Sequence, residues 1–322
     1  MTSMGSWLLR IAGLLIFVAA IGFGATKAPD RPLASLVARW APPPSDFVDV
    51  KGQLVHLRDV GPRDDVQPIV QIHGTSASLH TWEGWVAALE KEHRVITFDL
   101  PGFGLTGPSA DGDYSDTAYI DFVAALLDKL KLRQVILGGN SLGGEIAWEF
   151  AAAQPARVSA LILVDAAGYA FTPATLPLGF RIARTPGLRQ ITRFVLPRSV
   201  IEKSVREVYG DPSKVTAELI DRYFELTLRE GNRGALLQRI DQLNAGQFVG
   251  QLAGLHMPTL ILWGGRDRLI PPDNADAFKR DIVGSRLVRF PALGHVPQEE
   301  DPAATLVPVQ AFLKSLPIIN KT

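Results

Sequence analysis

One serine of the chain lies in a pattern that makes a serine hydroxyl reactive. Residues 139–143 read GNSLG, after the apolar run QVILG and before the helical stretch EIAWEFAAA. A serine on a sharp turn from strand to helix presents its hydroxyl to a cleft, and glycines on either side leave room for the adjoining backbone. The helix start adds partial positive charge and leaves the Leu142 amide free to donate to an oxyanion. We therefore predict Ser141 as a nucleophile, because a serine that only caps the helix would not need both glycines.

The elements that would position this serine follow from the hydrophobic pattern. Short β-branched runs alternate with amphipathic stretches, and no internal repeat interrupts them. The predicted strands are residues 47–50, 54–60, 69–72, 94–98, 134–137, 160–164, 259–263 and 287–290, and the predicted helices are residues 81–91, 116–131, 142–153, 273–282 and 302–315. Strands that are apolar on both faces and are followed by helices indicate an α/β fold. We predict a mostly parallel eight-stranded sheet with helices on both faces.

The stretch of residues 171–255 breaks this alternation. It contains no strand-like run, and Arg, Glu and Leu recur in it at helical spacing. About 85 residues are too many for a loop, so we predict a helical cap inserted after the sixth strand. A separate domain in series is the alternative, but the strand TLILWGG that follows favours an insertion. The core then comprises residues 46–170 and 256–322.

Five motifs, in this order, resemble those of the α/β-hydrolase superfamily, and the resemblance extends over residues 48–316. They are IHGTS at 72–76, DLPGFG at 99–104, the serine turn, WGGRD at 263–267 and GH at 294–295. The resemblance implies an α/β-hydrolase fold with a helical cap. Within the superfamily, GGNSLGGEIAW and LVDAAGY are most similar to segments of bacterial lipases and esterases. The pattern GNSxGG also occurs in hydrolases that cut carbon–carbon bonds of aromatic ring-cleavage products.

A base must remove the serine proton, and histidine has the pKa best suited to neutral pH. Four of the six histidines lie where a structural or exposed role is the simplest interpretation: His56, His80, His93 and His256. The resemblance implies that His295, in the loop between the last strand and the last helix, is the base. The resemblance also implies that the ring of His73 shapes the loop after the third predicted strand, which would help to bind the oxyanion and is called the oxyanion loop below.

An imidazole base needs a carboxylate that fixes its tautomer. Asp267 follows the seventh strand, where the resemblance places this acid, and the chain order Ser141, Asp267, His295 is the order that this fold uses. Asp165 is a rival, because it directly follows the sixth strand and some relatives draw the acid from there. Capping the turn is the structural alternative for Asp165.

The loop after the third predicted strand should complete the site. The resemblance implies a second oxyanion donor there, and we predict the backbone amide of Thr75 for this role. We expect His73, Gly74 and Ser76 to contact the substrate. In the cap, the candidate wall residues of a substrate pocket, each of which could instead pack inside the cap, are Phe171, Leu176, Phe180, Phe194 and Phe224.

Such a site implies acyl transfer to Ser141 and hydrolysis of the acyl-enzyme by water, with no metal or organic cofactor. We expect a serine hydrolase that cleaves small lipophilic esters. A carbon–carbon bond hydrolase is the main alternative. That group usually has a glycine-rich stretch with proline after its His-Gly, where this chain has TSAS at 75–78. A cofactor-free perhydrolase and a non-catalytic, membrane-tethered binding module are further alternatives.

Composition and charge exclude several other classes. The 322 residues include 33 Lys+Arg and 33 Asp+Glu, so the formal net charge is zero and no basic surplus is present for nucleic acid. A hydrophobic fraction of 47% is too high for a disordered chain. The chain has no Cys, which excludes disulfides, zinc–thiolate sites and a Cys nucleophile.

The N-terminal residues 1–27 are typical of a membrane segment. Residues 7–25 read WLLRIAGLLIFVAAIGFGA and carry one charge, Arg10. A helix of that length would reach about 28 Å, close to the thickness of a hydrocarbon core. We predict a single-pass anchor, with a cleaved signal and a secreted or periplasmic enzyme as the alternative. Residues 28–45, which include APPPS, are predicted to be a Pro-rich linker.

Overall fold

One twisted sheet organises the chain. The computed structural model describes residues 7, 10–14, 17, 27–170, 176–192 and 194–317. Over these residues eight strands pair in the order β1-β2-β4-β3-β5-β6-β7-β8. Their bounds are β1 Ser45–Val50, β2 Gln53–Val60, β3 Ile69–Ile72, β4 Val95–Phe98, β5 Val135–Asn140, β6 Val158–Val164, β7 Thr259–Gly264 and β8 Arg286–Phe290. The β1–β2 and β2–β4 pairs are antiparallel and the other pairs are parallel, so the predicted sheet is confirmed.

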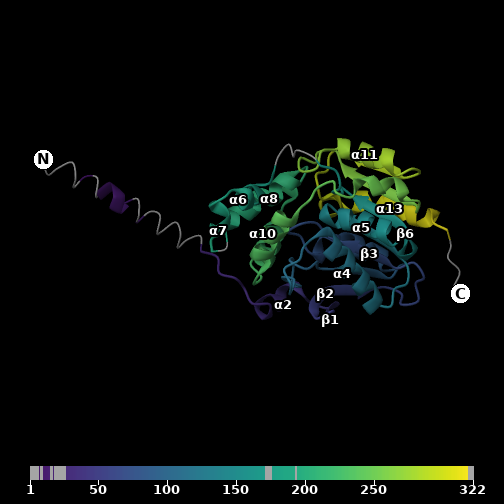
Figure 1. Cartoon of the computed structure of the whole chain (residues 1–322), viewed down its shortest axis with the longest axis horizontal. Coiled ribbons are helices and arrows are strands. Elements are labelled where there is room, and N and C mark those ends of the chain that lie inside the picture. Colours follow the sequence, from purple (N-terminus) through teal and green to yellow (C-terminus); the bar gives the residue numbers. More distant parts are fainter. Residues whose placement is uncertain are drawn as a thin grey trace.

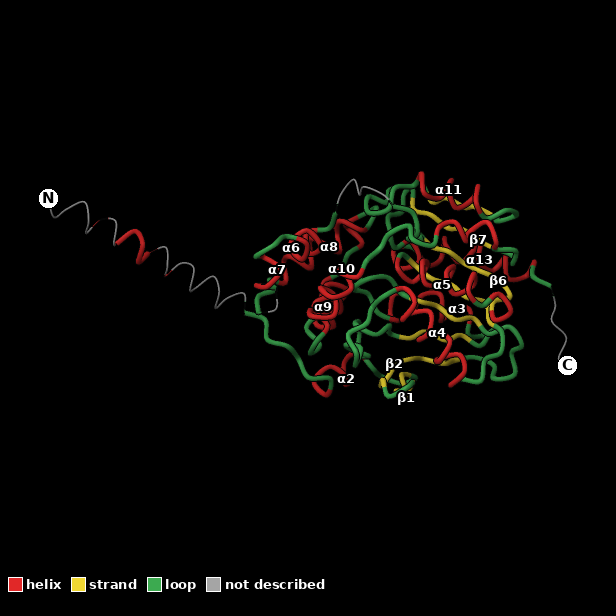
Figure 2. Tube along the Cα trace, viewed as in Figure 1, coloured by secondary structure: helices red, strands yellow, loops and turns green. Residues whose placement is uncertain are grey.

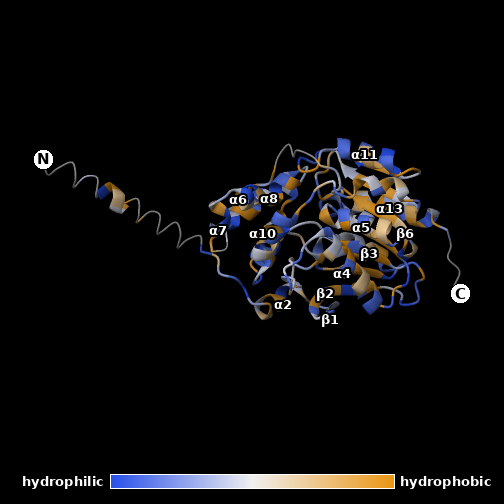
Figure 3. Cartoon of the chain, viewed as in Figure 1, coloured by the Kyte–Doolittle hydropathy of each residue, from blue (hydrophilic) through white to orange (hydrophobic). Residues whose placement is uncertain are grey.

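Helices cover both faces of this sheet (Figure 2). Their bounds are α3 Glu83–Leu89, α4 Asp116–Lys129, α5 Leu142–Ala153, α11 Asp273–Asp281, α12 Pro297–Glu300 and α13 Pro302–Ser315. Alternate strand residues point to opposite faces. Val135 and Leu137 therefore pack in the apolar cluster that includes α4, α5 and α11, whereas Ile136 packs in the cluster that includes α3 and α13. Figure 3 shows the resulting apolar interior, with hydrophilic residues on the outer side of α11.

The predicted cap stretch lies between β6 and β7. In its described part, residues 176–192 and 194–255, the chain forms helices and turns and no strand of the sheet. The helices are α6 Leu178–Arg184, α7 Leu188–Ile191, α8 Arg198–Val208, α9 Ala217–Thr227 and α10 Asn232–Gln242. Figure 1 shows α6, α7, α8 and α10 gathered at one end of the molecule, away from α11 and α13.

The segment of residues 28–45 is more than the linker that we predicted. It contains helix α2, Ala34–Trp40, whose buried Leu36 and Trp40 lie one turn apart and pack against Leu226 of α9. The Trp40 indole also donates a 2.7 Å hydrogen bond to Glu225. The prolines that suggested a spacer, at positions 42–44, follow this helix, so the Pro-rich part is limited to the end of the segment. The segment joins the core to the cap.

The predicted membrane anchor lies mostly outside the described residues. Of residues 1–27, the structure describes 7, 10–14, 17 and 27. Among the helices formed by described residues, none combines the length and the apolar character needed to cross a bilayer.

Candidate active site

Ser141 occupies a tight turn between β5 and α5. Its backbone has φ 56° and ψ −120°, a conformation that residues with side chains rarely adopt. A Cβ on Gly139 would lie 2.1 Å from the carbonyl oxygen of Gly143, and a Cβ on Gly143 would lie 2.2 Å from the carbonyl oxygen of Ile72. Both positions therefore require glycine, because the helix start is packed directly against the ends of β3 and β5. Such strain is common at functional sites.

His295 and Asp267 form a buried hydrogen-bonded pair. The His295 Nδ1 atom lies 2.7 Å from Asp267 Oδ2, and the two residues are 4% and 5% exposed. The other carboxylate oxygen accepts hydrogen bonds from the amides of Leu269 and Ile270, at 2.8 and 3.0 Å. A carboxylate only accepts, so His295 carries its proton on Nδ1. Its Nε2 is thereby left with a free lone pair, as a base requires.

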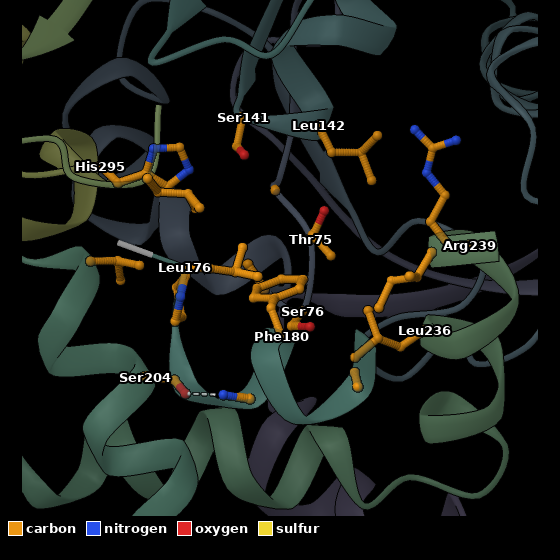
Figure 4. Close-up of a pocket in the computed structure, with 18 of the residues that line it drawn as sticks. Thr75, Ser76, Ser141, Leu142, Leu176, Phe180, Ser204, Leu236, Arg239 and His295 are labelled. Atoms are coloured by element: carbon orange, nitrogen blue, oxygen red, sulfur yellow. Dashed lines mark hydrogen bonds between the residues drawn. The ribbon is translucent and has the colours of Figure 1, made fainter. Parts of the chain in front are cut away.

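Ser141 and His295 line the same cavity (Figure 4). The serine follows β5, Asp267 follows β7 and the histidine follows β8, so the carboxyl ends of parallel strands bring the three together at one edge of the sheet. Within the described part of the chain, the imidazole of His295 is hydrogen-bonded to Asp267. No hydrogen bond joins this imidazole to the Ser141 hydroxyl in those residues. Hydrogen bonds of this kind often form only when substrate is bound.

Asp165, the rival acid, lies beside Asp267 without replacing it. Its carboxyl group is fully buried and accepts a 2.9 Å hydrogen bond from the amide of Gly264. Burial, together with the negative charge of Asp267, raises the pKa of Asp165 well above its usual range. Ionisation of Asp165 is thus disfavoured, and the carboxylate in contact with His295 is that of Asp267.

The same three side chains form a group with metal-ligand spacing. Asp165, Asp267 and His295 offer ligand atoms within 4.8 Å of one another. A metal ligand must be deprotonated, and the raised pKa of Asp165 opposes this. The group therefore fits a set of proton-sharing residues better than a metal site. The absence of a cofactor stays a prediction.

The predicted oxyanion donors flank the serine. Leu142 begins α5, and the first amides of a helix have no acceptor within it. Thr75, with its neighbours Gly74 and Ser76, lines the cavity together with Ser141. The loop approaches the turn so closely that a Cβ on Gly74 would lie 3.0 Å from the Cβ of Ser141. An oxyanion bonded to the serine would thus form between the two segments.

His73 is not in contact with the cavity, contrary to our prediction for it. Its ring is fully buried behind the loop. The Leu100 amide donates to Nε2 at 2.9 Å, so Nδ1 carries the proton and donates to the Gly74 carbonyl at 2.7 Å. Burial lowers the pKa of His73, which keeps the ring neutral. The ring fastens the oxyanion loop and is too deep to touch a substrate.

The cavity above the serine has a volume of about 300 Å³ and mostly apolar walls from the core and the cap. Two of the predicted wall residues, Leu176 and Phe180, line it (Figure 4). Phe194 is 63% exposed, and Phe224 packs in a separate apolar cluster. Phe171 lies outside the described residues.

A buried group of charged residues at the cavity wall was missed by the sequence analysis. Arg239 of α10 lies 2.8 Å from Asp116 and 3.6 Å from Glu145. Burial, followed by the charge of Asp116, raises the pKa of Glu145 to about 7. Burial and the charge of Glu145 raise the pKa of Glu149 to about 9. The sequence does carry a sign of this group, because Glu145 and Glu149 lie one turn apart in the otherwise apolar helix EIAWEFAAA.

Serine, histidine and aspartate also meet at a second place, away from the cavity. His56 Nδ1 lies 2.7 Å from Asp99, and His56 Nε2 lies 3.0 Å from the Ser45 hydroxyl. This hydroxyl also accepts a hydrogen bond from Arg58, and the Asp99 carboxylate accepts one from the Leu79 amide. Both His56 and Asp99 are fully buried. The group ties β1 and β2 to the loops beside them, which is a structural role.

Comparisons with known proteins identify the family to which the chain belongs. Residues 67–302 match the family described as the alpha/beta hydrolase fold. A 2-hydroxymuconate semialdehyde hydrolase from a Pseudomonas species is 28% identical, over 76% of this chain and 86% of that protein. The structure of a meta-cleavage product hydrolase from Pseudomonas fluorescens is 26% identical, with a TM-score of 0.72, over 84% of this chain and 97% of the other.

A second solved structure shares the fold over a longer part of the chain. It is a bacterial membrane phospholipase A, 24% identical, with a TM-score of 0.72 and coverage of 97% of this chain and 98% of the other. The family match covers more than two thirds of the chain, and the sheet order and the serine turn accord with it. This chain therefore belongs to the family of the α/β-hydrolase fold.

Proposed function

We propose that this protein is a serine hydrolase that cleaves lipophilic carboxylic esters through an acyl-enzyme on Ser141. One observation carries the proposal: Ser141 lies in an apolar cavity that is also lined by His295, which is hydrogen-bonded to Asp267. A serine is a weak nucleophile until a base takes its proton, and the base works best when a carboxylate fixes its tautomer.

The reaction follows from these positions. His295 Nε2 accepts the Ser141 proton while the serine oxygen attacks the ester carbonyl, and Asp267 stabilises the resulting imidazolium. The amides of Leu142 and Thr75 donate to the oxyanion, and each donor contributes about 3 kcal/mol in the transition state. The imidazolium then protonates the departing alcohol. Water repeats the sequence on the acyl-enzyme and releases the acid.

The charges around the cavity favour a neutral substrate. Arg239 is paired with Asp116, and Arg233 is paired with Asp30 through its Nε at 3.1 Å. These two buried arginines line the cavity but already have carboxylate partners. The third arginine at the cavity, Arg184, is exposed on α6. An apolar acyl chain therefore suits the walls better than a substrate carboxylate does.

A carbon–carbon bond hydrolase is the second candidate. The observation that favours it is the 28% identity to the Pseudomonas hydrolase named for 2-hydroxymuconate semialdehyde, which covers 76% of this chain. The serine, histidine and aspartate would be the same residues. The two candidates differ in the substrate that the cavity accepts.

Hydrolysis of p-nitrophenyl esters of graded acyl length tests the proposal. We expect turnover of short to medium chains, and a loss of at least ~1,000-fold in kcat for Ser141→Ala and for His295→Ala. Ser159→Ala, a serine on β6 away from the cavity, serves as the control. Efficient turnover of a dienol ring-cleavage product without turnover of esters would select the second candidate. No turnover of either substrate class would contradict both.

We also infer that residues 7–25 anchor the protein to a membrane. The support is the apolar character of this stretch, with Arg10 as its one charge. The full chain should stay in the membrane fraction after an alkaline carbonate wash, and a chain that begins at Ala28 should be released. Release of the full chain would contradict the inference.

A further inference from the structure

The loop that carries His295 is in direct contact with the end of cap helix α8. The His295 amide donates a 2.8 Å hydrogen bond to the carbonyl of Val208. Beside this bond the two backbones touch: a Cβ on Gly210 would lie 2.3 Å from the Ala292 carbonyl oxygen, and a Cβ on Gly294 would lie 2.4 Å from that of Val208. Residues 208–210 of the cap are therefore packed directly against residues 292–295, the loop that carries His295 and is called the base loop below.

A single buried carboxylate connects both sides of this contact. Glu300, at the end of α12, is 6% exposed. Its Oε2 accepts hydrogen bonds from the backbone amides of Gly294, at 2.8 Å, and Gly210, at 2.9 Å. Its Oε1 accepts a hydrogen bond from the backbone amide of Asp211 at 2.8 Å. Hydrogen bonds to a charged acceptor are stronger than neutral ones. One of the three fixes the residue that directly precedes the base.

We propose that Glu300 is a positioning residue, which holds His295 in place by joining its loop to the docked cap. The inference rests on the proposed function, because it takes His295 as the base. Glu300 acts through the backbone and is not expected to touch the substrate. It follows that the 208–211 segment is a fixed part of the active site, even if other parts of the cap move to admit the substrate.

The neighbouring Glu299 makes a different kind of contact, which supplies a matched control. Its carboxylate accepts from the hydroxyls of Tyr209 at 2.8 Å and Tyr223 at 3.2 Å, and it pairs with Arg222 at 2.5 Å. These partners are side chains of the cap. In the described part of the chain, Glu299 makes no hydrogen bond to the base loop through its side chain. Both glutamates thus hold the cap, but only Glu300 also holds the base.

The test compares Glu300→Ala, Glu300→Gln and Glu299→Gln with the full-length wild type. We expect Glu300→Ala to lower kcat by about 100-fold with KM within ~3-fold, because a small misplacement of a catalytic group costs that much. Glu300→Gln keeps one carbonyl oxygen for Gly294 and Gly210 but loses the charge and the acceptor for Asp211, so we expect an intermediate loss of kcat, about 10-fold. Glu299→Gln should change kcat by less than ~3-fold.

Two readouts separate this inference from the proposed function, because neither needs an ester. One is the low-field proton resonance of His295 Nδ1–H, and the other is the rate at which a fluorophosphonate labels Ser141. In Glu300→Ala the resonance should shift or broaden and labelling should slow, while Glu299→Gln leaves both unchanged. If Glu300→Ala does not fold, Glu300→Gln takes its place. A shifted resonance and slower labelling in Glu300→Gln, with neither change in Glu299→Gln, would then support the inference. Wild-type resonance and labelling in the Glu300 variants, or equal losses in Glu299→Gln, would overturn the inference.

Discussion

Asp165 and Asp267 are two buried carboxyl groups that lie side by side, and only Asp267 is hydrogen-bonded to His295. Two neighbouring carboxylates cannot both ionise easily in a buried site. Burial and the charge of Asp267 raise the pKa of Asp165, and the carboxyl group that contacts the imidazole is that of Asp267. The two positions that the sequence analysis treated as rivals thus have different roles in one group.

Amide substitutions should separate the two roles. In Asp267→Asn the histidine loses the acceptor that fixes its tautomer, so we expect kcat to fall by about 10,000-fold. Asp165 has a raised pKa and is not the hydrogen-bond partner of His295, so we expect Asp165→Asn to keep kcat within ~3-fold of the wild type. Steady-state ester hydrolysis at pH 7 measures both. A fall in Asp165→Asn as deep as that in Asp267→Asn would show that our assignment is wrong.

The glycine of the serine turn should tolerate no side chain. In Gly143→Ala the new Cβ would meet the Ile72 carbonyl oxygen at 2.2 Å, so the turn must move. We expect a loss of activity of ~100-fold or more, measured with the best ester. Gly234→Ala in α10 is the control, because no atom lies within 4 Å of its new Cβ. Gly234→Ala should keep its activity and gain ~0.5–1 kcal/mol in free energy of unfolding. A loss of activity in Gly234→Ala similar to that in Gly143→Ala would contradict the packing argument.

Glu149 should make the protein less stable as the pH rises. Burial raises its pKa from 4.5 to about 9, so between these values the folded state keeps a proton that the unfolded chain has released. Each rise in pH within that window therefore lowers the free energy of unfolding. We expect Glu149→Gln to match the wild type near pH 5 and to exceed it by ~1–3 kcal/mol at pH 8. Urea unfolding measures this.

The exposed Glu218 supplies the control for this experiment. Glu218→Gln should show the same pH dependence as the wild type. If Glu149→Gln is equally stable relative to the wild type at pH 5 and pH 8, the buried carboxyl group is not the cause of the pH dependence.

Arg239 should be needed for folding stability, because it is the buried cation next to Asp116, at 2.8 Å. Arg239→Met leaves a buried carboxylate without its partner, which costs about 3–5 kcal/mol. The double variant Arg239→Met with Asp116→Asn should recover part of that loss, since the uncompensated charge is gone. Urea unfolding of the single and double variants measures the difference. Equal stability of the two would argue against an ion pair.

The sheet was predictable because its strands are short apolar runs with both faces buried. All residues of β3, β4, β5 and β7 are buried, and such strands read as nearly continuous Val, Ile and Leu. The serine turn was predictable for a local reason as well, since its glycines lie within two residues of Ser141. The fold and the frame of the site follow from patterns of this kind.

Features that depend on distant contacts were not predictable. Helix α2 is held by a hydrogen bond between Trp40 and Glu225, which are 185 positions apart. The role of Glu300 depends on amides of the cap loop, 89 and 90 positions away. The exposed Phe194 and the cavity residue Phe180 are both phenylalanines in the cap stretch, and nothing in the local pattern distinguishes them.

In the proposed reaction Ser141 becomes a nucleophile because His295, held by Asp267, takes its proton. Intact-protein mass spectrometry after incubation with a fluorophosphonate, followed by peptide mapping, tests this most directly. We expect one adduct per chain, located on Ser141, and labelling slower by at least ~100-fold in His295→Ala. No adduct on the folded wild-type protein, an adduct on another residue, or labelling of Ser141 that does not depend on His295 would contradict it.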